Sequence, residues 1–172
     1  WQDDCYYYFA TAFTDTVLIT GSTDGIGVTT ARNILGSTHN ILIHGRDEDR
    51  IRIAADSLRN NNNNIRRSMK GGAASKTTTE KKNLVVPLPP ADLSTIRGCY
   101  DLAREVKELC NSSSTGTGTG TGTGDSDMNL KILVNNAGIY SNRLIRTTDG
   151  LESTFAVNVL APFILSSMLL ST

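Results

Sequence analysis

The feature that most constrains this chain is the glycine-rich segment TGSTDGIG at residues 20–27, which directly follows apolar residues 17–19. This order is typical of a buried strand that turns sharply into a helix. A glycine at position 21 lets the backbone leave the strand with a positive φ angle. Glycines at 25 and 27 remove side chains where a pyrophosphate would approach the anion-attracting helix N-terminus. The segment therefore predicts a phosphate-binding turn, with an ordinary glycine-rich turn as the alternative.

Apolar runs and amphipathic stretches alternate along the rest of the chain. Strands are predicted at residues 16–20, 41–44, 84–88 and 130–135, and helices at 28–35, 47–58, 94–110 and from 149 onward. The second run is apolar throughout, as in parallel strands buried on both faces. Pro87 cannot donate a ladder hydrogen bond, which predicts an edge position for the third strand. The pattern predicts an α/β fold, a doubly wound parallel sheet with helices on both faces, as far as the helix after strand four.

Composition limits the classes of partner. The 17 basic and 17 acidic residues cancel, which argues against nucleic acid and charged membrane surfaces. Cys5, Cys99 and Cys110 have no metal-ligand spacing with His39 or His44, so no metal site is predicted, and their odd number indicates a reducing, cytoplasmic setting. Cys99 and Cys110 share an apolar helical face and are predicted to be buried. His44, at a strand end, is predicted to be solvated or bonded locally.

Two low-complexity segments interrupt the pattern. Residues 60–64 are all Asn, the stretch that follows to residue 82 has no periodicity, and residues 115–124 repeat Thr-Gly five times. We interpret residues 60–82 and 111–127 as solvated insertions within one domain, residues 1–172. The chain begins with Trp1 and ends directly behind an apolar run, as expected of a piece of a longer sequence. The prediction of a cytoplasmic setting leaves membrane association of the full-length protein open.

A second distinctive motif, Asn135-Asn136-Ala137-Gly138, follows the fourth predicted strand. Small residues at the carboxyl end of a strand let a nucleotide lie close to the backbone, and Asn amides can tie neighbouring strands together. In this order, with strands and helices alternating between the motifs, the chain resembles the short-chain dehydrogenase/reductase family. The resemblance implies a Rossmann-type dinucleotide site with the cofactor-binding residues Gly21, Ser22, Thr23, Asp24, Gly25, Ile26, Gly27, Arg46, Asp92, Leu93, Asn135, Ala137 and Gly138.

Two further positions carry this resemblance. In the family, an acid after strand three bonds the adenine amino group and the next residue supports the ring, which implies these roles for Asp92 and Leu93. A helix N-cap formed by Asp92 or Ser94 is the alternative. Asn158 resembles the family's helix-borne Asn, whose backbone carbonyl holds a water of the proton relay, so it is the one catalytic residue implied. An Asn bonded to its own helix is the alternative.

Arg46 bears on the choice of cofactor. In a dinucleotide site, an acid at the end of strand two would bond the adenosine ribose and repel a 2′-phosphate, whereas a guanidinium forks onto that phosphate. Arg46 in this place favours NADP over NAD, with a solvated loop arginine as the alternative. Asp24 departs from the pattern, because many NADP-preferring relatives carry a base at that position.

Residues 149–155, DGLESTF, are most similar to the retinol-dehydrogenase-like branch of the family. The resemblance implies an NADP-dependent oxidoreductase that transfers hydride between an alcohol and a carbonyl, with a small-molecule substrate. The family's Ser and Tyr-x-x-x-Lys cannot be placed, since none of the five tyrosines has a Lys four residues later. The chain as given is therefore expected to be inactive, and an inactive NAD(P)-binding or interaction module is the alternative. Apolar residues at 163–170 are expected to be exposed and to favour association of copies through the C-terminal helix.

Overall fold

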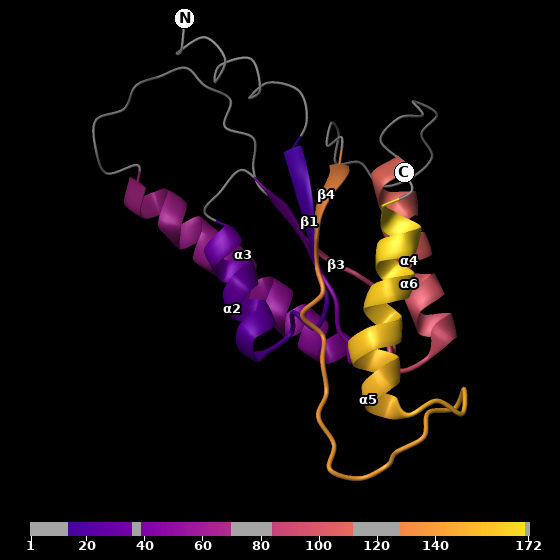
Figure 1. The fold of residues 1–172 in the computed structure, drawn as a ribbon. Helices are drawn as coiled ribbons and strands as arrows, with labels where there is room; N and C mark the ends of the chain where they lie inside the picture. Colours follow the sequence, from indigo (N-terminus) through magenta and orange to yellow (C-terminus); the bar gives the residue numbers. More distant parts are fainter. Residues whose placement is uncertain (1–13, 36–38, 70–83, 112–127, 171–172) are drawn as a thin grey trace, which may run out of the picture.

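The computed structural model describes residues 14–35, 39–69, 84–111 and 128–170. One parallel sheet has the strand order β3-β2-β1-β4 and consists of β1 (Thr14–Ile19), β2 (Asn40–Ile43), β3 (Val85–Pro87) and β4 (Met128–Val134). The helices are α2 (Gly25–Ile34), α3 (Glu48–Met69), α4 (Ile96–Asn111), α5 (Ser153–Phe155), the π-helix η1 (Ala156–Leu160) and α6 (Ala161–Leu169). The predicted α/β fold is confirmed (Figure 1).

Alternate side chains of the central strands enter two separate cores. Val17 and Ile19 of β1 pack with the buried faces of α2 and α3, whereas Leu18 between them packs with α4 and α6. All three are fully buried. Figure 1 shows α2 and α3 on one side of the sheet and α4 and α6 on the other. Because both faces are covered, each residue of these strands meets apolar neighbours, and this explains why their sequences are apolar throughout.

The strand order also locates the functional edge of the sheet. The chain runs outward from β1 through β2 to β3, then returns to the other side of β1 to form β4. In a parallel sheet, this reversal leaves a crevice at the carboxyl ends of the two strands that flank it, here β1 and β4. β3 pairs only with β2, so the edge position predicted from Pro87 is confirmed for the described sheet.

Helix α3 is longer than predicted. It continues to Met69, so the prediction that a disordered or floppy insertion starts at residue 60 is wrong for residues 60–69. The Asp47 carboxylate accepts from the Arg50 amide at 2.9 Å and starts the helix, and Ile51 and Leu58 anchor it in the core. Asn costs less than about 1 kcal/mol per residue in a helix, and no Gly or Pro interrupts this run. Residues 70–82 and 112–127 of the predicted insertions lie outside the described residues.

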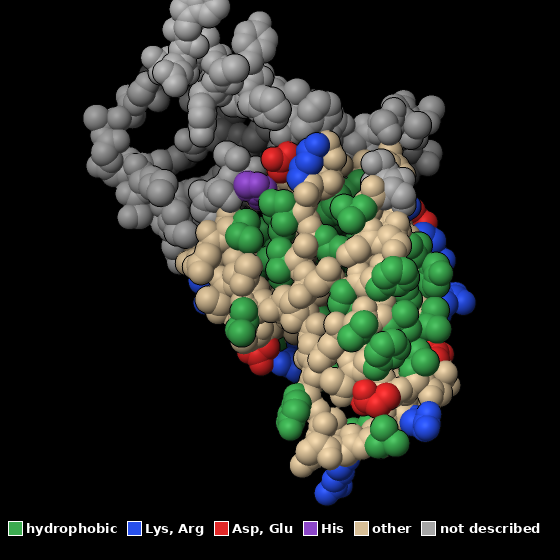
Figure 2. Space-filling model, in the orientation of Figure 1, with side chains coloured by type: hydrophobic (Ala, Val, Ile, Leu, Met, Phe, Trp, Pro, Cys, Tyr) green, Lys and Arg blue, Asp and Glu red, His purple; other side chains and the backbone are tan. Residues whose placement is uncertain are grey.

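The C-terminal helix starts at Ser153, four residues later than predicted, and passes through η1 before Pro162 takes its place in the first turn of α6. The expectation that its apolar residues are exposed is wrong for Leu165 and Leu169, which pack into the core with α4. Phe163 is exposed, and hydrophobic side chains gather over this part of the surface (Figure 2). Association of copies through this helix stays a prediction. No helix among the described residues is long and apolar enough to cross a membrane.

The two described cysteines lie on the inner face of α4, as predicted. Cys99 is buried and Cys110 half-buried. Burial raises the pKa of the Cys99 thiol to about 11, with smaller contributions from the charges of Asp92 and Asp149. A thiol with such a raised pKa stays protonated and behaves as a small apolar side chain.

Candidate functional site

A pocket of about 770 Å³ opens at the carboxyl edge of the sheet, beside the N-terminus of α2. Four segments that are far apart in the sequence meet around it, namely the glycine turn, the start of the β2–α3 connection, the β3–α4 connection and the segment after β4. Most of the predicted cofactor-binding residues line it: Gly21, Thr23, Asp24, Ile26, Gly27, Arg46, Asp92, Leu93, Ala137 and Gly138. Its volume lies in the range of small-molecule and cofactor sites.

The glycine turn is shaped by two close backbone approaches. Gly21 has φ 65°, a conformation that L side chains rarely adopt. A Cβ on Gly27 would collide with the Gly21 carbonyl oxygen and would lie 2.6 Å from Asn136 Nδ2. Helix α2 therefore packs directly against the turn, and its N-terminus faces the pocket with no side chain at position 27 in between.

Thr20 and Asn136 fasten the glycine turn to β4. The buried Thr20 hydroxyl accepts from the backbone amides of Asn136 and Ala137, both at 3.0 Å. The Asn136 side-chain amide donates to the carbonyls of Thr20, at 2.9 Å, and Gly21, at 3.1 Å. Sequence reasoning gave Thr20 no role in the site, because its partners lie more than a hundred positions away, whereas the expectation that an Asn amide of the motif ties neighbouring strands together is confirmed for Asn136. The position of Asn136 between Asn135 and Ala137 in the motif was the available signal.

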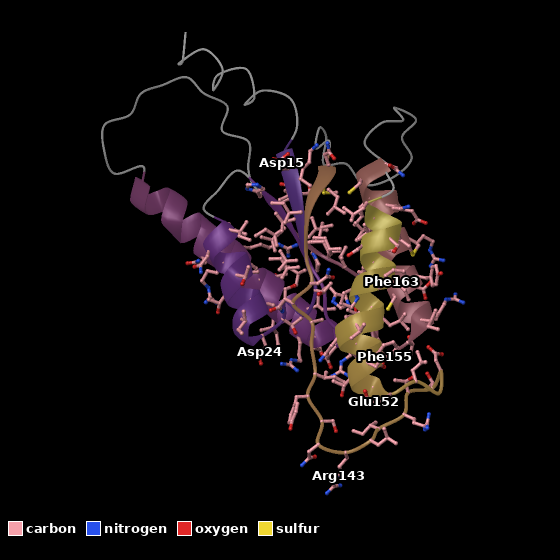
Figure 3. All side chains as sticks on the ribbon, in the orientation of Figure 1. Asp15, Asp24, Arg143, Glu152, Phe155 and Phe163 are labelled. Carbon is pink, nitrogen blue, oxygen red and sulfur yellow. The ribbon has the colours of Figure 1, made fainter. Side chains whose placement is uncertain are left out.

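Charges of both signs surround the pocket mouth. Asp24 caps α2 through a bond from the Gly25 amide to its carboxylate at 2.7 Å, and the same carboxylate pairs with Arg50 of α3 at 2.9 Å. Figure 3 shows Asp24 at the start of α2. Arg46 and Ile26 also line the pocket; Arg46 is exposed, and the Ile26 side chain is 80% exposed. In the described part of the chain, no group of three or more His, Cys, Asp or Glu side chains is placed to hold a metal ion.

His44 is buried beneath the glycine turn, with 2% of its surface exposed, so the prediction of a solvated side chain is wrong. Its ring bonds reach residues 23 and 47 positions away, so they are not local in the sequence either. Its Nδ1 accepts from the Gly21 amide at 3.1 Å, and Nε2 lies 3.1 Å from the Ala91 carbonyl. Burial lowers the pKa of His44, against smaller opposing effects of the Ala91 bond and the Asp92 charge. Ser22 is fully buried and its hydroxyl bonds the His44 backbone, so it positions the turn; the cofactor contact predicted for it stays a prediction.

Asp92 and Leu93, in the β3–α4 connection, both line the pocket; Leu93 is buried and Asp92 is exposed. The Asp92 carboxylate accepts from the Ser94 amide at 3.0 Å. The N-cap of α4 is Thr95, whose hydroxyl accepts from the Gly98 amide at 3.0 Å. The alternative of a cap at Asp92 or Ser94 is therefore wrong by one to three positions, and Asp92 keeps a second carboxylate oxygen beside the pocket.

Besides Ser22, three predicted residues lie outside the pocket lining. Gly25 starts α2 at φ 56°, with open space around it, and Asn135 Nδ2 reaches Ser166 Oγ at 3.5 Å. Asn158, in η1, pairs with both backbone groups of Ile139: Oδ1 accepts from its amide at 2.9 Å and Nδ2 donates to its carbonyl at 2.8 Å. The alternative of an Asn bonded to its own helix is therefore wrong. A π-turn of this kind often marks a functional position in a helix.

Comparison with known proteins gives this geometry a family context. No model of a protein family matches the chain. Human retinol dehydrogenase 14 is 30% identical over 156 residues, which cover 90% of this chain and 39% of that protein. A short-chain dehydrogenase from Sphingobium yanoikuyae in complex with NADPH aligns with a TM-score of 0.59 at 24% identity, over 90% of this chain and 47% of that one. L-sorbose reductase from Gluconobacter frateurii, complexed with NADPH and L-sorbose, aligns with a TM-score of 0.61 at 23% identity, over 93% and 48%.

The chain spans about two fifths of the length of the human relative and about half of each of the two solved chains. The two structures show the shared fold, and the sequence match extends over nearly the whole chain. The glycine turn, the Asn-Asn-Ala-Gly segment and the parallel sheet that brings them together agree with that match. The sequence match and the shared fold support the short-chain dehydrogenase/reductase family, in its retinol-dehydrogenase-like branch, as the family of this chain.

Proposed function

We propose that this chain binds NADP(H) in the pocket beside α2 and forms the cofactor-binding part of an oxidoreductase that transfers hydride between an alcohol and a carbonyl. The observation that carries the proposal is the meeting of the glycine turn, Arg46 and the segment after β4 around one pocket. The names of the relatives, a retinol dehydrogenase and an L-sorbose reductase, support the reaction class. Two of the solved relatives are complexes with NADPH.

The residues present fit a dinucleotide. The N-terminus of α2 would receive the pyrophosphate, because its dipole favours an anion and Gly27 leaves the approach clear. Asp92 and Leu93 would border the adenine, and Ile26 offers an exposed apolar surface to the opposite end of the ligand. A bound nicotinamide would supply or accept the hydride. The Asn158 side chain is committed to Ile139, which leaves the main-chain carbonyl of Asn158 for the relay role that the resemblance implies.

Preference for NADP over NAD rests on Arg46, which lines the pocket just beyond the end of β2. The carboxylate of Asp24 would repel a 2′-phosphate, but its pairing with Arg50 at 2.9 Å offsets that charge. Both side chains of this pair are more than half exposed, so solvent screens the pair and its effect is modest. Arg46 is left to form the charge-assisted bonds to the phosphate.

Arg46→Asp is expected to weaken NADPH binding about a hundredfold, since it removes a phosphate contact and adds a like charge, and to leave NADH binding within a few-fold. Arg52→Asp makes the same charge change on α3, away from the pocket, and is the matched control. Fluorescence titration of both cofactors on the three proteins measures this. Equal affinity of the wild type for NADPH and NADH, unchanged by Arg46→Asp, would reject the NADP preference.

The 172 residues contain Asn158 but no Tyr followed four positions later by Lys. Such a Tyr would supply the proton that quenches the developing alkoxide. We therefore assign cofactor binding, without turnover, to these residues taken by themselves. Substrate contacts and the cytoplasmic location expected from composition stay predictions.

A further inference from the structure

We propose that His44 is a positioning residue of the cofactor site, which locks the glycine turn to the β3–α4 connection only while its imidazole is neutral and protonated at Nε2. The proposal goes beyond cofactor binding itself, because it makes the shape of the site depend on the protonation state of one buried ring. It rests on the proposed function for its binding readout.

The ring joins two walls of the pocket. On one side, Nδ1 accepts from the amide of Gly21, the residue with positive φ in the turn. On the other side, Nε2 meets the Ala91 carbonyl, one residue before Asp92. The Ala91 amide in turn donates to the Gly45 carbonyl at 3.0 Å, so the connection is held to both the side chain and the backbone after β2. His44 thus links the phosphate end of the pocket to its adenine end.

The partners of the two ring nitrogens fix the tautomer. A backbone amide can only donate and a carbonyl can only accept, so Nδ1 must carry the lone pair and Nε2 the hydrogen. A second proton on Nδ1 would point at the Gly21 N–H and break that bond. The backbone of His44 strengthens the attachment of the turn: its carbonyl accepts from the Ser22 amide at 2.9 Å, and its amide donates to the Ser22 hydroxyl at 3.0 Å.

The surroundings favour the neutral ring. The imidazole is 2% exposed, and this burial lowers the His44 pKa below its usual 6.5. The charged groups that line the same pocket are of both signs: Asp24 on the glycine turn, Arg46, Asp47 and Arg50 after β2, and Asp92 after β3. The Ala91 hydrogen bond and the charge of Asp92 both raise the His44 pKa, and the lowering by burial is the largest effect. The segment after β4 places no charged residue in the pocket lining.

Because the bridge needs a neutral His44 ring, acid should weaken both the stability of the chain and its affinity for nucleotide. Above pH 6.5 the ring is neutral and the turn is locked. As pH falls through the lowered pKa, a proton enters the ring, the Gly21 bond is lost, and both the stability contributed by the bridge and the affinity for nucleotide decline. Affinity should fall by about tenfold for each pH unit below the His44 pKa, as expected for one proton excluded by the ligand.

ADP-ribose is the probe of choice, because it contains the adenosine and pyrophosphate of the cofactor but lacks the 2′-phosphate. That phosphate titrates at about pH 6 and would add its own pH dependence to the measured affinity. Its affinity is measured calorimetrically from about pH 8 downward, as far as circular dichroism shows that the chain stays folded. The wild type and His39→Gln, which removes the other histidine, should both lose affinity with acid. His44→Gln, whose amide can donate and accept, should bind with little pH dependence. His44→Leu should bind about tenfold more weakly at every pH.

A long-range proton–nitrogen correlation spectrum of the imidazole tests the bridge independently of nucleotide binding and of how well the variants fold. The wild type at neutral pH should show Nε2 protonated and Nδ1 bare. An Nδ1–H tautomer, a charged ring at neutral pH, or an acid profile that persists in His44→Gln would overturn the proposal. ADP-ribose that binds at no pH, together with the Nε2–H tautomer, would reject the proposed cofactor site while leaving the bridge in place.

Discussion

Gly27→Ala is expected to abolish nucleotide binding and to lower the free energy of unfolding by about 2–4 kcal/mol. The added Cβ would collide with the Gly21 carbonyl oxygen and crowd Asn136 Nδ2 and Ser22 Cα, at 2.6 and 2.9 Å. Two of these three atoms belong to the backbone of the glycine turn, so no side-chain rotation relieves the clash. Helix α2 must move away from the turn, and its N-terminus then no longer faces the pocket.

Gly150→Ala is the matched control. Gly150 also has a positive φ, 77°, but nothing lies within 4 Å of an added Cβ and the residue does not line the pocket. Its cost should be backbone strain alone, about 1–2 kcal/mol, with nucleotide affinity retained. Urea unfolding and NADPH titration of both variants compare the two effects. If Gly27→Ala binds NADPH as Gly150→Ala does, close packing of α2 on the turn is not what builds the site.

Thr20→Val is expected to have the second largest effect, a loss of about 1–3 kcal/mol of stability accompanied by weaker nucleotide binding. Valine has nearly the shape of threonine, so the change removes the hydroxyl and little volume. The Ala137 amide, 3.0 Å from that hydroxyl, would then lose its acceptor in a part-buried position, and the Asn136 amide would keep only its bond to the Val134 carbonyl at 3.0 Å. An unpaired buried amide costs about 1–3 kcal/mol, and the segment carrying Ala137 and Gly138 would no longer be held at the pocket.

Thr20→Ser keeps the hydroxyl and deletes only a methyl group. It should retain most of the binding and lose about 1 kcal/mol of stability. Thermal or urea unfolding and NADPH titration of the three proteins separate the hydroxyl from the methyl. Equal losses of stability and NADPH affinity in Thr20→Val and Thr20→Ser would mean that packing, and not the two bonds from backbone amides, fixes the segment after β4.

The central strands could be predicted from the sequence for a simple physical reason. A strand covered on both faces needs an apolar residue at nearly every position, as at residues 17–19 and 41–43. A short, uninterrupted apolar segment of this kind is typical of such a strand. The glycine turn was equally visible, because a sharp exit from a strand and a close helix approach both require glycine. The position of the pocket could be predicted from the fold class, because a doubly wound sheet places the segments after β1 and β4, which carry residues 21 and 138, at the same edge.

The predictions that were wrong or missed depend on contacts between distant segments. Thr20 and His44 are ordinary residues locally, and only the folded chain shows that one holds β4 and the other joins two loops. The helix through residues 60–69 was missed because a run of Asn is a weak helix former by itself; the core contacts of Ile51 and Leu58 start a helix that the run then continues. Thr95 was missed as a cap because three neighbouring residues could serve equally well.

The most direct test of the cofactor site is an amide correlation spectrum of the chain titrated with NADP⁺, read at the glycines. Gly21, Gly27 and Gly138 line the pocket, and their signals should shift together with one dissociation constant. Gly150, which does not line it, should stay unmoved and serves as the internal control. If NADP⁺ leaves the three pocket signals in place, or moves Gly150 instead, the chain does not bind the cofactor at the carboxyl edge of its sheet.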